Sequence, residues 1–285
     1  MKYLVRVFSM ILTVVMLSGM FVNAATFSDV PEGSSNAEAI DVLSSLGLLV
    51  GDGDGTFRPD DTITRAEFSA VMLRAMALGD AASGAMGQTQ YSDVAAEHWA
   101  SGFINLATQQ GILVGDGDGT FRPEDPVTYE EAVKIVVAAL GYTPAATAKG
   151  GYPSGYLVIA SEEKILRGVS GTNGQPASRG MVSTMVYNAL EVPIMQQTGF
   201  GTNVTYEKTN SMLLDTLNLT KVEGVVTRIP GSTDTRLQSD QIEFEVAKEY
   251  RIVNSKLTFT NSDLGRIKLR VGSTNAKQYL ELYCS

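Results

Sequence analysis

The sequence predicts a mainly α-helical bundle of three helix–turn–helix repeats, followed by a small all-β domain. The stretch GDGDGTFRP occurs at residues 51–59 and again at residues 115–123, a spacing of 64 residues. Beyond about residue 217 the pattern changes, and apolar residues alternate along the chain as they do in strands. A composition of 44% hydrophobic and 19% charged residues is that of an ordinary globular protein.

The first 24 residues are predicted to be a secretory signal peptide. Lys2 and Arg6 precede an apolar run from Val7 to about Val22, and residues 22–24 (VNA) have the form of a cleavage site. A membrane anchor is the alternative, but the run is short for a spanning helix and ends in small residues. We therefore expect export, with no membrane association after cleavage.

The expected mature protein is strongly acidic. Without Lys2 and Arg6 it has 20 basic residues against 31 acidic ones, which gives a net charge near −11. This charge argues against non-specific binding to nucleic acid or to anionic lipid. Cys284 is the only cysteine, so no disulfide can form within the chain.

The two copies of the nonapeptide lie within longer repeats. At an offset of 64 residues, FSDV (27–30) aligns with YSDV (91–94), GLLV (47–50) with GILV (111–114), and TRAE (64–67) with TYEE (128–131). Apolar residues near helical spacing flank each copy, and Thr64 with Glu67 has the spacing of a capping box at a helix start. Each repeat is therefore predicted to contain two helices joined by a turn, and Gly79 and Gly141 are predicted to end the second helix.

A third, degenerate unit is predicted at an offset of 53 residues from the second. SGYLVIA (154–160) aligns with SGFINLA (101–107), and KIL (164–166) aligns with GIL (111–113). Its turn has lost the aspartates, and its second helix is predicted to open near residues 176–179. We expect repeats at residues 25–80, 89–146 and 147–195, and we expect their helix faces to be buried against one another in a compact bundle.

The repeated glycine- and aspartate-rich stretch does not fit a calcium-binding loop. Counted from Asp52, such a loop requires Gly at position 6 and a bidentate Glu at position 12, where this chain has Phe57 and Ile63. The second copy fails in the same way. We instead predict a tight turn in which Gly51 and the two glycines after it allow positive φ, the aspartates cap turn amides and Phe57 is buried. No metal and no cofactor is expected.

Residues 200–285 are predicted to form a small β-rich domain of unassigned role. Residues 210–217 (NSMLLDTL) have the pattern of a short helix. Residues 222–227, 241–246, 266–271 and 278–283 carry apolar residues at alternate positions, as strands do. Four to six strands in about 80 residues suggest a barrel or a sandwich.

The repeats resemble the S-layer homology (SLH) family. The residues that carry the resemblance are FSDV, GLLVGDGDGTFRP and ITRAEF in the first repeat (27–30, 47–59 and 63–68), with HWA (98–100) in the second. The resemblance covers roughly residues 26–195. It implies a three-pronged, pseudo-threefold helical bundle that attaches an exported bacterial protein to the cell wall.

The resemblance also implies a ligand and a set of contact residues. Members of the family bind, without a covalent bond, a secondary cell-wall polysaccharide that is linked to peptidoglycan and often carries pyruvate ketals. The arginine of TRAE, the tryptophan of the first helix and the main chain of the glycine turn line the binding grooves between repeats. Carried onto this sequence, the expected ligand-binding residues are Arg65, Trp99, Arg179, Asp29, Asp93, Gly51 and Gly115.

This chain departs from the family pattern at several of these positions. Tyr129 stands where the second repeat would have its arginine, and Ser35 where the first would have its tryptophan. Gly180 and Met181 depart from the motif after Arg179 in the third unit. These departures suggest that only one or two of the grooves bind ligand.

The residues themselves leave alternatives open. Arg65 lies one residue inside a predicted helix start, where acids are usually favoured, and its guanidinium could bind a ketal carboxylate through two parallel hydrogen bonds. It could equally bond to a neighbouring repeat, and Trp99 could belong to the core. Asp29 and Asp93 fit local turn or cap residues better than ligand contacts.

The sequence favours a non-enzymatic binding module at the cell wall or cell surface of a bacterium. Two alternatives stay open: a subunit that self-associates into a surface layer, and, less favoured, a wall-attached glycan hydrolase. His98 is the only histidine, and the acids of residues 200–285 show no spacing that singles out a catalytic pair.

Overall fold

The computed structural model describes residues 27–199, 204–228, 243–248, 272–274 and 277–284. The predicted signal peptide lies outside these ranges. The chain divides between Leu217 and Asn218 into two compact units, which are described separately below. The predicted start of the β-rich domain, residue 200, therefore lies before the observed division.

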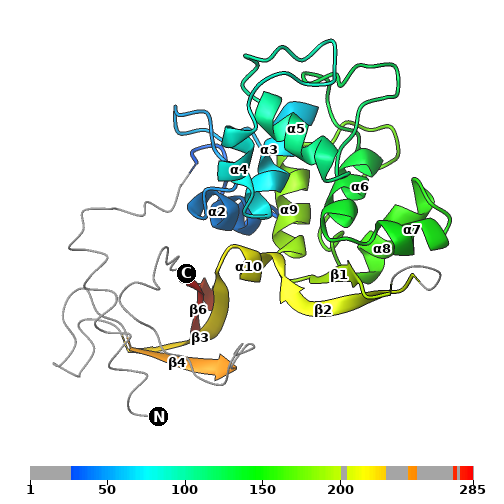
Figure 1. The fold of residues 1–285 in the computed structure, drawn as a ribbon. Helices are drawn as coiled ribbons and strands as arrows, with labels where there is room; N and C mark the ends of the chain where they lie inside the picture. The colour runs from blue at the N-terminus through cyan, green and yellow to red at the C-terminus, as the bar shows by residue number, and fades with distance from the viewer. Residues whose placement is uncertain (1–26, 200–203, 229–242, 249–271, 275–276, 285) are drawn as a thin grey trace. The chain divides into compact units, whose positions relative to one another are not determined.

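The first unit is built mainly from helices (Figure 1). The helices described in residues 27–217 are α2 (Ala37–Ser45), α3 (Arg65–Ala75), α4 (Gly79–Gly84), α5 (Ser101–Gln109), α6 (Tyr129–Ala139), α7 (Thr143–Ala148), α8 (Ser154–Glu162), α9 (Arg179–Ala189) and α10 (Leu213–Thr216). The predicted pairs are α2 with α3, α5 with α6 and α8 with α9. The short helices α4 and α7 were not predicted, because six residues hold too few apolar positions to show a period.

The predicted helix starts are confirmed. Thr64 accepts a hydrogen bond from the Glu67 amide at 3.2 Å, and Glu67 accepts one from the Thr64 amide at 2.9 Å. Glu131 accepts from the Thr128 amide in the same way at the start of α6. Gly141 follows α6 with φ of 82°, as predicted, but Gly79 does not end α3. Ala77 takes the left-handed conformation there (φ 59°), and Gly79 opens α4.

The three helix pairs are joined through the segments that lead into α3, α6 and α9. The Ile63 amide donates to the Ala177 carbonyl at 3.1 Å, the Ala177 amide to the Val127 carbonyl at 2.8 Å, and the Val127 amide to the Ile63 carbonyl at 3.0 Å. These bonds form a closed ring. Packing follows the same order, because α3 lies against α5, α6 against α8, and α9 against α2 (Figure 1).

The glycine-rich turns place one aromatic residue each in the core. Phe57 and Phe121 are fully buried, as predicted for Phe57 and its counterpart. Gly53 and Gly55 have φ of 81° and 88°, conformations that L side chains rarely adopt. The prediction for Gly51 was wrong in its reason, because its φ is not positive. A Cβ there would lie 2.4 Å from the Phe27 ring and 2.5 Å from the Thr56 carbonyl oxygen, so glycine is required for close packing.

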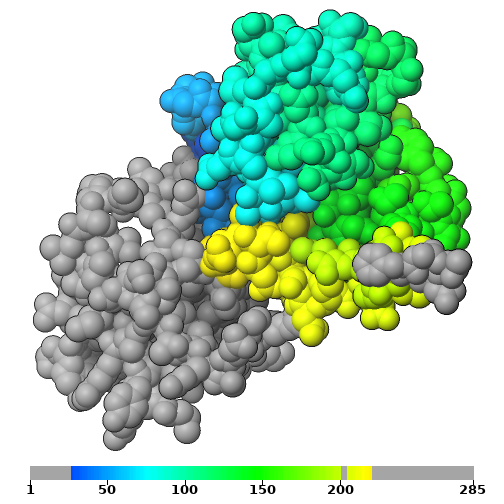
Figure 2. Space-filling model, in the orientation of Figure 1, coloured from blue at the N-terminus to red at the C-terminus, as the bar shows by residue number. Residues whose placement is uncertain are grey.

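A hairpin after α9 packs on the helices. Strands β1 (Pro193–Gln197) and β2 (Tyr206–Met212) pair in antiparallel fashion, and the space-filling view shows this segment along the edge of the helical unit (Figure 2). The Tyr142 hydroxyl donates to the Pro193 carbonyl at 2.8 Å, and the Met195 amide donates to the Leu140 carbonyl at 2.9 Å. The predicted helix over 210–217 is partly wrong, since residues 210–212 finish β2 and only Leu213–Thr216 are helical.

The second unit contains a four-stranded antiparallel sheet in the order β4-β3-β6-β5. Its strands are β3 (Thr220–Arg228), β4 (Glu243–Lys248), β5 (Gly272–Thr274) and β6 (Lys277–Cys284). The predicted strands at 222–227 and 278–283 are confirmed, and the one at 241–246 overlaps β4. The predicted strand at 266–271 lies outside the described residues, and closure into a barrel or sandwich stays a prediction.

None of the helices in the described ranges is both long enough and apolar enough to cross a membrane.

Candidate ligand-binding groove

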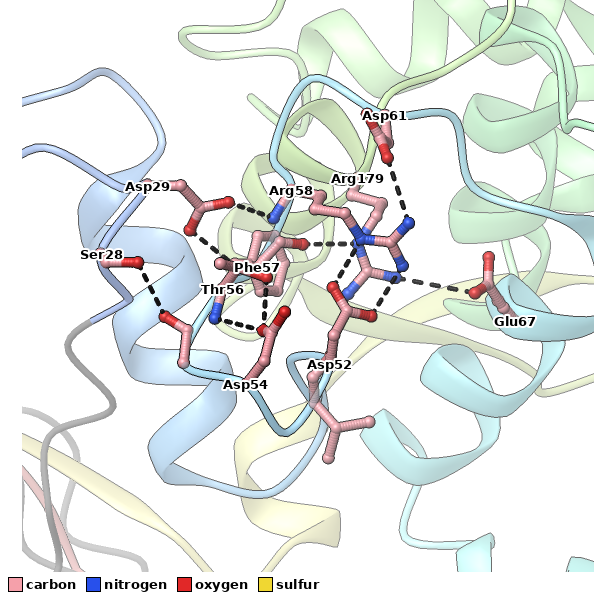
Figure 3. Close-up of polar contacts among 12 residues, drawn as sticks. Ser28, Asp29, Asp52, Asp54, Thr56, Phe57, Arg58, Asp61, Glu67 and Arg179 are labelled. Carbon is pink, nitrogen blue, oxygen red and sulfur yellow. Dashed lines mark hydrogen bonds and ion pairs between the residues drawn. The ribbon is translucent and has the colours of Figure 1, made fainter.

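Arg179, at the first position of α9, is buried against the first glycine-rich turn (Figure 3). Its Nε donates to the Phe57 carbonyl and its Nη2 to the Val50 carbonyl, both at 2.9 Å. The guanidinium also lies over the Phe57 ring, 4.7 Å from the centroid, and its Nη1 is 3.7 Å from a Glu67 carboxylate oxygen. Only 7% of the residue is exposed.

Arg65, at the first position of α3, makes the same contacts with the second turn. Its Nε donates to the Phe121 carbonyl at 2.8 Å and its Nη2 to the Val114 carbonyl at 2.9 Å. The guanidinium lies 4.9 Å from the Phe121 ring centroid and 3.7 Å from Glu131, and 4% of the residue is exposed.

These contacts give both predicted arginines a role between helix pairs. Each holds two carbonyls from a turn distant in sequence, and each has an aromatic ring and a carboxylate beside its charge. The open alternative for Arg65, bonding to a neighbouring repeat, is the arrangement that the structure shows. Tyr129, at the first position of α6, stands where α3 and α9 have an arginine. It packs on Gly171, where a Cβ would lie 2.4 Å from the Tyr129 ring.

A cavity of about 190 Å³ lies beside Arg179, and we call it the Trp99 groove. It is lined by the first glycine-rich turn, by one face of α3, by Trp99 and by Arg179. The residues that line it are Leu49, Val50, Gly51, Asp52, Ile63, Glu67, Ala70, Val71, Arg74, Trp99 and Arg179. Residues 49–74, Trp99 and Arg179, which are far apart in sequence, therefore meet at one cavity.

Trp99 stands just before α5 and is 49% exposed. Its ring lies 5.9 Å from the His98 ring and 6.4 Å from the Phe103 ring, measured between centroids. The alternative that Trp99 belongs to the core is therefore wrong. An exposed aromatic face at a cavity can stack on the apolar face of a sugar ring.

Arg74 lies on α3 in the same groove and was not predicted. Its guanidinium stands over the Phe103 ring, 5.3 Å from the centroid, and burial lowers the pKa of the guanidinium. Among the described residues, no carboxylate lies within ion-pair distance of it. Arg74 is thus a partly desolvated cation that no acid of the described part of the chain neutralises.

Asp52 carries negative charge into the groove but is itself paired. Arg58 donates to both of its carboxylate oxygens, at 2.5 and 2.7 Å (Figure 3). The hydrogen bond from Arg58 lowers the pKa of Asp52, and the charges of Arg58 and Arg179 add to the effect. Asp52 therefore stays ionised and fixes Arg58, which has the strained φ of 57°.

Asp29 and Asp93 hold the turns together and lie outside the residues that line the Trp99 groove. Asp29 accepts hydrogen bonds from the Phe57 and Arg58 amides at 2.9 and 2.7 Å (Figure 3), and Asp93 accepts the equivalent pair in the second turn. Burial opposes ionisation of Asp29, but the two backbone hydrogen bonds outweigh it and lower the pKa of its carboxyl. The interpretation as turn residues is confirmed.

The remaining predicted residues are the turn glycines. Gly51 lines the Trp99 groove, and Gly115 occupies the same place in the second turn, where a Cβ would lie 2.2 Å from the Thr120 carbonyl oxygen. The aspartates of these turns are engaged locally, since Asp54 accepts from the Thr56 amide at 2.9 Å and Asp118 from the Thr120 amide at 2.8 Å. No group of three or more His, Cys, Asp or Glu in the described ranges could hold a metal ion.

Comparison with protein families matches two segments of the chain. Residues 26–69 and 90–133 match the S-layer homology domain. These segments contain both glycine-rich turns and the starts of α3 and α6. The chain therefore carries two S-layer homology domains, in agreement with the resemblance found in the sequence.

Curated relatives share these domains. The chain is 41% identical over 172 residues to the Middle cell wall protein of Brevibacillus brevis, 34% identical over 217 residues to the Surface layer protein of Brevibacillus choshinensis, and 32% identical over 177 residues to the Cell surface protein of Thermoanaerobacter kivui. The matches cover 60%, 73% and 62% of this chain but only 16%, 19% and 23% of those relatives. A shorter match, 33% identical over 122 residues, is to Exoglucanase XynX of Acetivibrio thermocellus, and it covers 43% of this chain and 11% of that enzyme.

The chain is thus a protein with S-layer homology domains and a location at the bacterial cell wall or cell surface. The relatives matched over most of this chain are cell-wall and surface-layer proteins, whereas the enzyme is matched over a smaller part.

Proposed function

We propose that the chain anchors an exported bacterial protein to the cell wall by binding a secondary wall polysaccharide, pyruvylated and linked to peptidoglycan, without a covalent bond. The observation that carries the proposal is the Trp99 groove, where an exposed indole lies beside charged and main-chain groups from distant segments. Such a surface can hold a sugar by stacking and fix its polar groups by hydrogen bonds.

The proposal includes a third, degenerate repeat at residues 147–195 in a pseudo-threefold bundle. Three observations support it: α8 begins with Ser-Gly as α5 does, Ser178 accepts from the Met181 amide as Thr64 accepts from Glu67, and Arg179 repeats the contacts of Arg65. The ring of bonds among residues 63, 127 and 177 then joins all three units.

We assign the predicted site residues two kinds of role. Trp99 is proposed to contact the sugar directly, and the main chain at Gly51 to form one wall of the groove. Arg179 is proposed to shape the groove by holding the Val50 carbonyl in place, with its Nη1 facing Glu67. At the second turn Arg65 is proposed to hold the Val114 carbonyl in the same way, and Gly115 to take the place of Gly51. Asp29 and Asp93 are proposed to fix the two turns.

A surface-layer subunit is the second candidate function. The observation that supports it is the match over 217 residues, at 34% identity, to a relative named Surface layer protein. The two functions are compatible, because an array subunit also has to be held on the wall. A wall-attached hydrolase is the weakest candidate, since the enzyme relative matches only 122 residues.

Sedimentation with cell-wall sacculi of the producing bacterium tests the proposal. The chain from residue 25 onward should pellet with intact sacculi and stay in the supernatant with sacculi whose secondary polysaccharide has been removed by hydrofluoric acid. Equal pelleting with both would contradict polysaccharide binding. Sheets seen by electron microscopy without any wall material would support the surface-layer function.

A further inference from the structure

We propose that Asn173 is a site of spontaneous modification, where the side-chain amide is lost as ammonia through a cyclic imide, and that Glu130 sets the rate of this reaction. Asn173 and Gly174 form the only Asn-Gly pair in the sequence. They lie in the segment that leads into α9, and both are exposed, so water reaches them. The inference is independent of the proposed function, because it concerns a reaction of the chain itself.

An asparagine followed by glycine has little steric hindrance to this reaction, because glycine has no Cβ and rotates freely about its backbone bonds. The backbone nitrogen of the glycine gives its proton to hydroxide and attacks the side-chain carbonyl carbon of the asparagine. The side-chain nitrogen leaves as ammonia, and a five-membered imide forms. Water opens the imide at either carbonyl, which gives aspartate or isoaspartate. Overall one water is consumed and one ammonia is released.

Asn173 and Gly174 are the two central residues of a tight turn. The Gln175 amide donates to the Thr172 carbonyl at 3.0 Å, which closes the turn, and Gly174 has φ of 81°. Glycine meets this requirement for positive φ at the lowest cost. Of the side-chain hydrogen bonds described in this turn, none involves the Asn173 side chain. Its carbonyl carbon is therefore open to attack once the turn bond breaks.

The attacking nitrogen is held by Glu130, which stands at the second position of α6. The Gly174 amide donates to a Glu130 carboxylate oxygen at 2.8 Å. To attack, the nitrogen has to lose this bond and its proton, and the amide anion would then face a carboxylate of the same charge. A hydrogen bond to a charged acceptor is worth about a factor of ten or more in an equilibrium. Glu130 therefore slows formation of the imide.

The two glycine-rich turns contain Asp-Gly pairs, which could form the same imide but are less reactive. An ionised carboxylate resists attack by a nucleophile more than an amide does. The carboxylate of Asp54 also accepts from the Thr56 amide at 2.9 Å. That of Asp118 accepts from the Thr120 amide at 2.8 Å. The reaction is therefore expected at Asn173 before it occurs in these turns.

Modification of residue 173 weakens the connection between α6 and the segment that leads into α9. The Gln175 carbonyl accepts from the Tyr129 amide at 2.8 Å, at the first position of α6. An isoaspartate adds one carbon to the main chain two residues before Gln175. Either product also places a new negative charge close to Glu130. The modified protein is therefore expected to be less stable than the unmodified one.

Peptide mapping by mass spectrometry, during incubation of the folded protein in mildly alkaline buffer, tests the inference. Trypsin cleavage after Arg167 and Arg179 gives a peptide in which Asn173 is the only asparagine. This peptide should gain the mass difference between an amide and an acid, and it should separate chromatographically into aspartate and isoaspartate forms. The rate should be about tenfold or more below that of the same protein unfolded in guanidinium chloride. Glu130→Ala should raise the rate in the folded protein about fivefold or more, and Glu130→Gln, which keeps an acceptor without the charge, should give an intermediate rate.

Matched variants separate the role of Glu130 from a general loss of structure. Glu32→Ala removes another exposed carboxylate and should leave the rate unchanged. Asn173→Gln would require a less favourable six-membered ring and should abolish the mass gain. The thermal unfolding midpoint of each variant is measured before incubation. If Glu130→Ala unfolds close to the incubation temperature, the rate of Glu130→Gln decides.

Three results would overturn the inference. Equal rates for the wild type and both Glu130 variants, at unchanged stability, would show that Glu130 does not control the reaction. A slower rate in Glu130→Ala would mean that the carboxylate promotes the reaction, and a mass gain confined to other asparagines would refute the site. The modified protein, separated by ion exchange, should have a lower unfolding midpoint than the unmodified protein, and equal midpoints would contradict the effect on the connection to α6.

Discussion

The guanidinium of Arg65 meets Phe121 twice, because its Nε donates to the Phe121 carbonyl at 2.8 Å and its plane lies 4.9 Å from the centroid of the same residue's ring. Arg179 and Phe57 repeat both contacts at 2.9 and 4.7 Å. In both cases an arginine at the start of a helix links its own helix pair to the glycine-rich turn of another pair.

Replacing either buried arginine should therefore cost stability. Arg65→Lys keeps the charge but cannot reach two carbonyls in a fork, so we expect the free energy of unfolding to fall by about 2 kcal/mol. Denaturant unfolding followed by circular dichroism measures this. Arg179→Lys should lower the free energy of unfolding by a similar amount, whereas Arg167→Lys, at an exposed position, should leave it unchanged. An unchanged unfolding midpoint for Arg65→Lys would show that the hydrogen bonds of Arg65 contribute nothing to stability.

Trp99 should matter for binding and not for folding. Because half of the side chain is exposed, Trp99→Ala should move the unfolding midpoint by no more than about 2 °C. Its affinity for wall polysaccharide should fall about tenfold, since the stacking face is lost. Val158→Ala, which truncates another exposed apolar side chain, serves as the control, and a large loss of stability in Trp99→Ala would make the indole a structural residue.

Gly51 and Gly84 make a matched pair for the packing of the first turn. A Cβ at Gly51 meets the Phe27 ring at 2.4 Å and the Thr56 carbonyl at 2.5 Å, so Gly51→Ala should destabilise the protein by about 1–3 kcal/mol. A Cβ at Gly84 meets nothing within 4 Å inside α4, so Gly84→Ala should be neutral or slightly stabilising. Unfolding midpoints of the two variants in the opposite order would contradict the close packing at Gly51.

The turn aspartates should make stability depend on acid. The pKa values of Asp29 and Asp93 are lowered in the folded protein, so their contribution is present above the unfolded value of about 3.8 and is lost as the pH falls through the lower folded values. Asp29→Asn should lower the unfolding midpoint at about pH 6 and have a smaller effect at about pH 3. A difference that is the same at both pH values would mean that ionisation of Asp29 does not contribute.

Calcium should not stabilise the glycine-rich turns. Asp54 already holds the Thr56 amide and hydroxyl, and Asp52 holds Arg58, so these carboxylates are committed to the turn. We expect the unfolding midpoint to be the same with millimolar calcium and with a chelator, because a ligand that does not bind the folded state cannot shift it. A rise that depends on calcium concentration would restore the metal interpretation.

Local signals in the sequence predicted the local structure well. The capping pair Thr64 and Glu67 marked the start of α3, and the repeat itself placed both turns and their buried phenylalanines. The predictions were wrong where contacts with other segments determine the local conformation. Ala77 rather than Gly79 takes the left-handed position after α3, and residues 210–212 join β2 because β1 provides a partner strand.

The site was harder to predict, because roles at an interface depend on which side chains meet. Arg65 and Arg179 carry the motif, but only the fold shows that their donors face carbonyls 49 to 129 residues away. Arg74 belongs to no motif, and only the fold shows that its guanidinium lies over the ring of Phe103 on another helix.

The closed ring of bonds through Ile63, Val127 and Ala177 sets a limit on how this architecture can vary. A stacked repeat protein has ends to which another unit can be added, but here each connecting segment already has both of its neighbours. Deleting one helix pair would leave backbone groups of both remaining connecting segments without hydrogen-bond partners. A fourth helix pair would find no unpaired connecting segment to bond with. If the proposed function holds, gain or loss of wall-binding capacity is therefore expected to proceed by whole sets of three helix pairs.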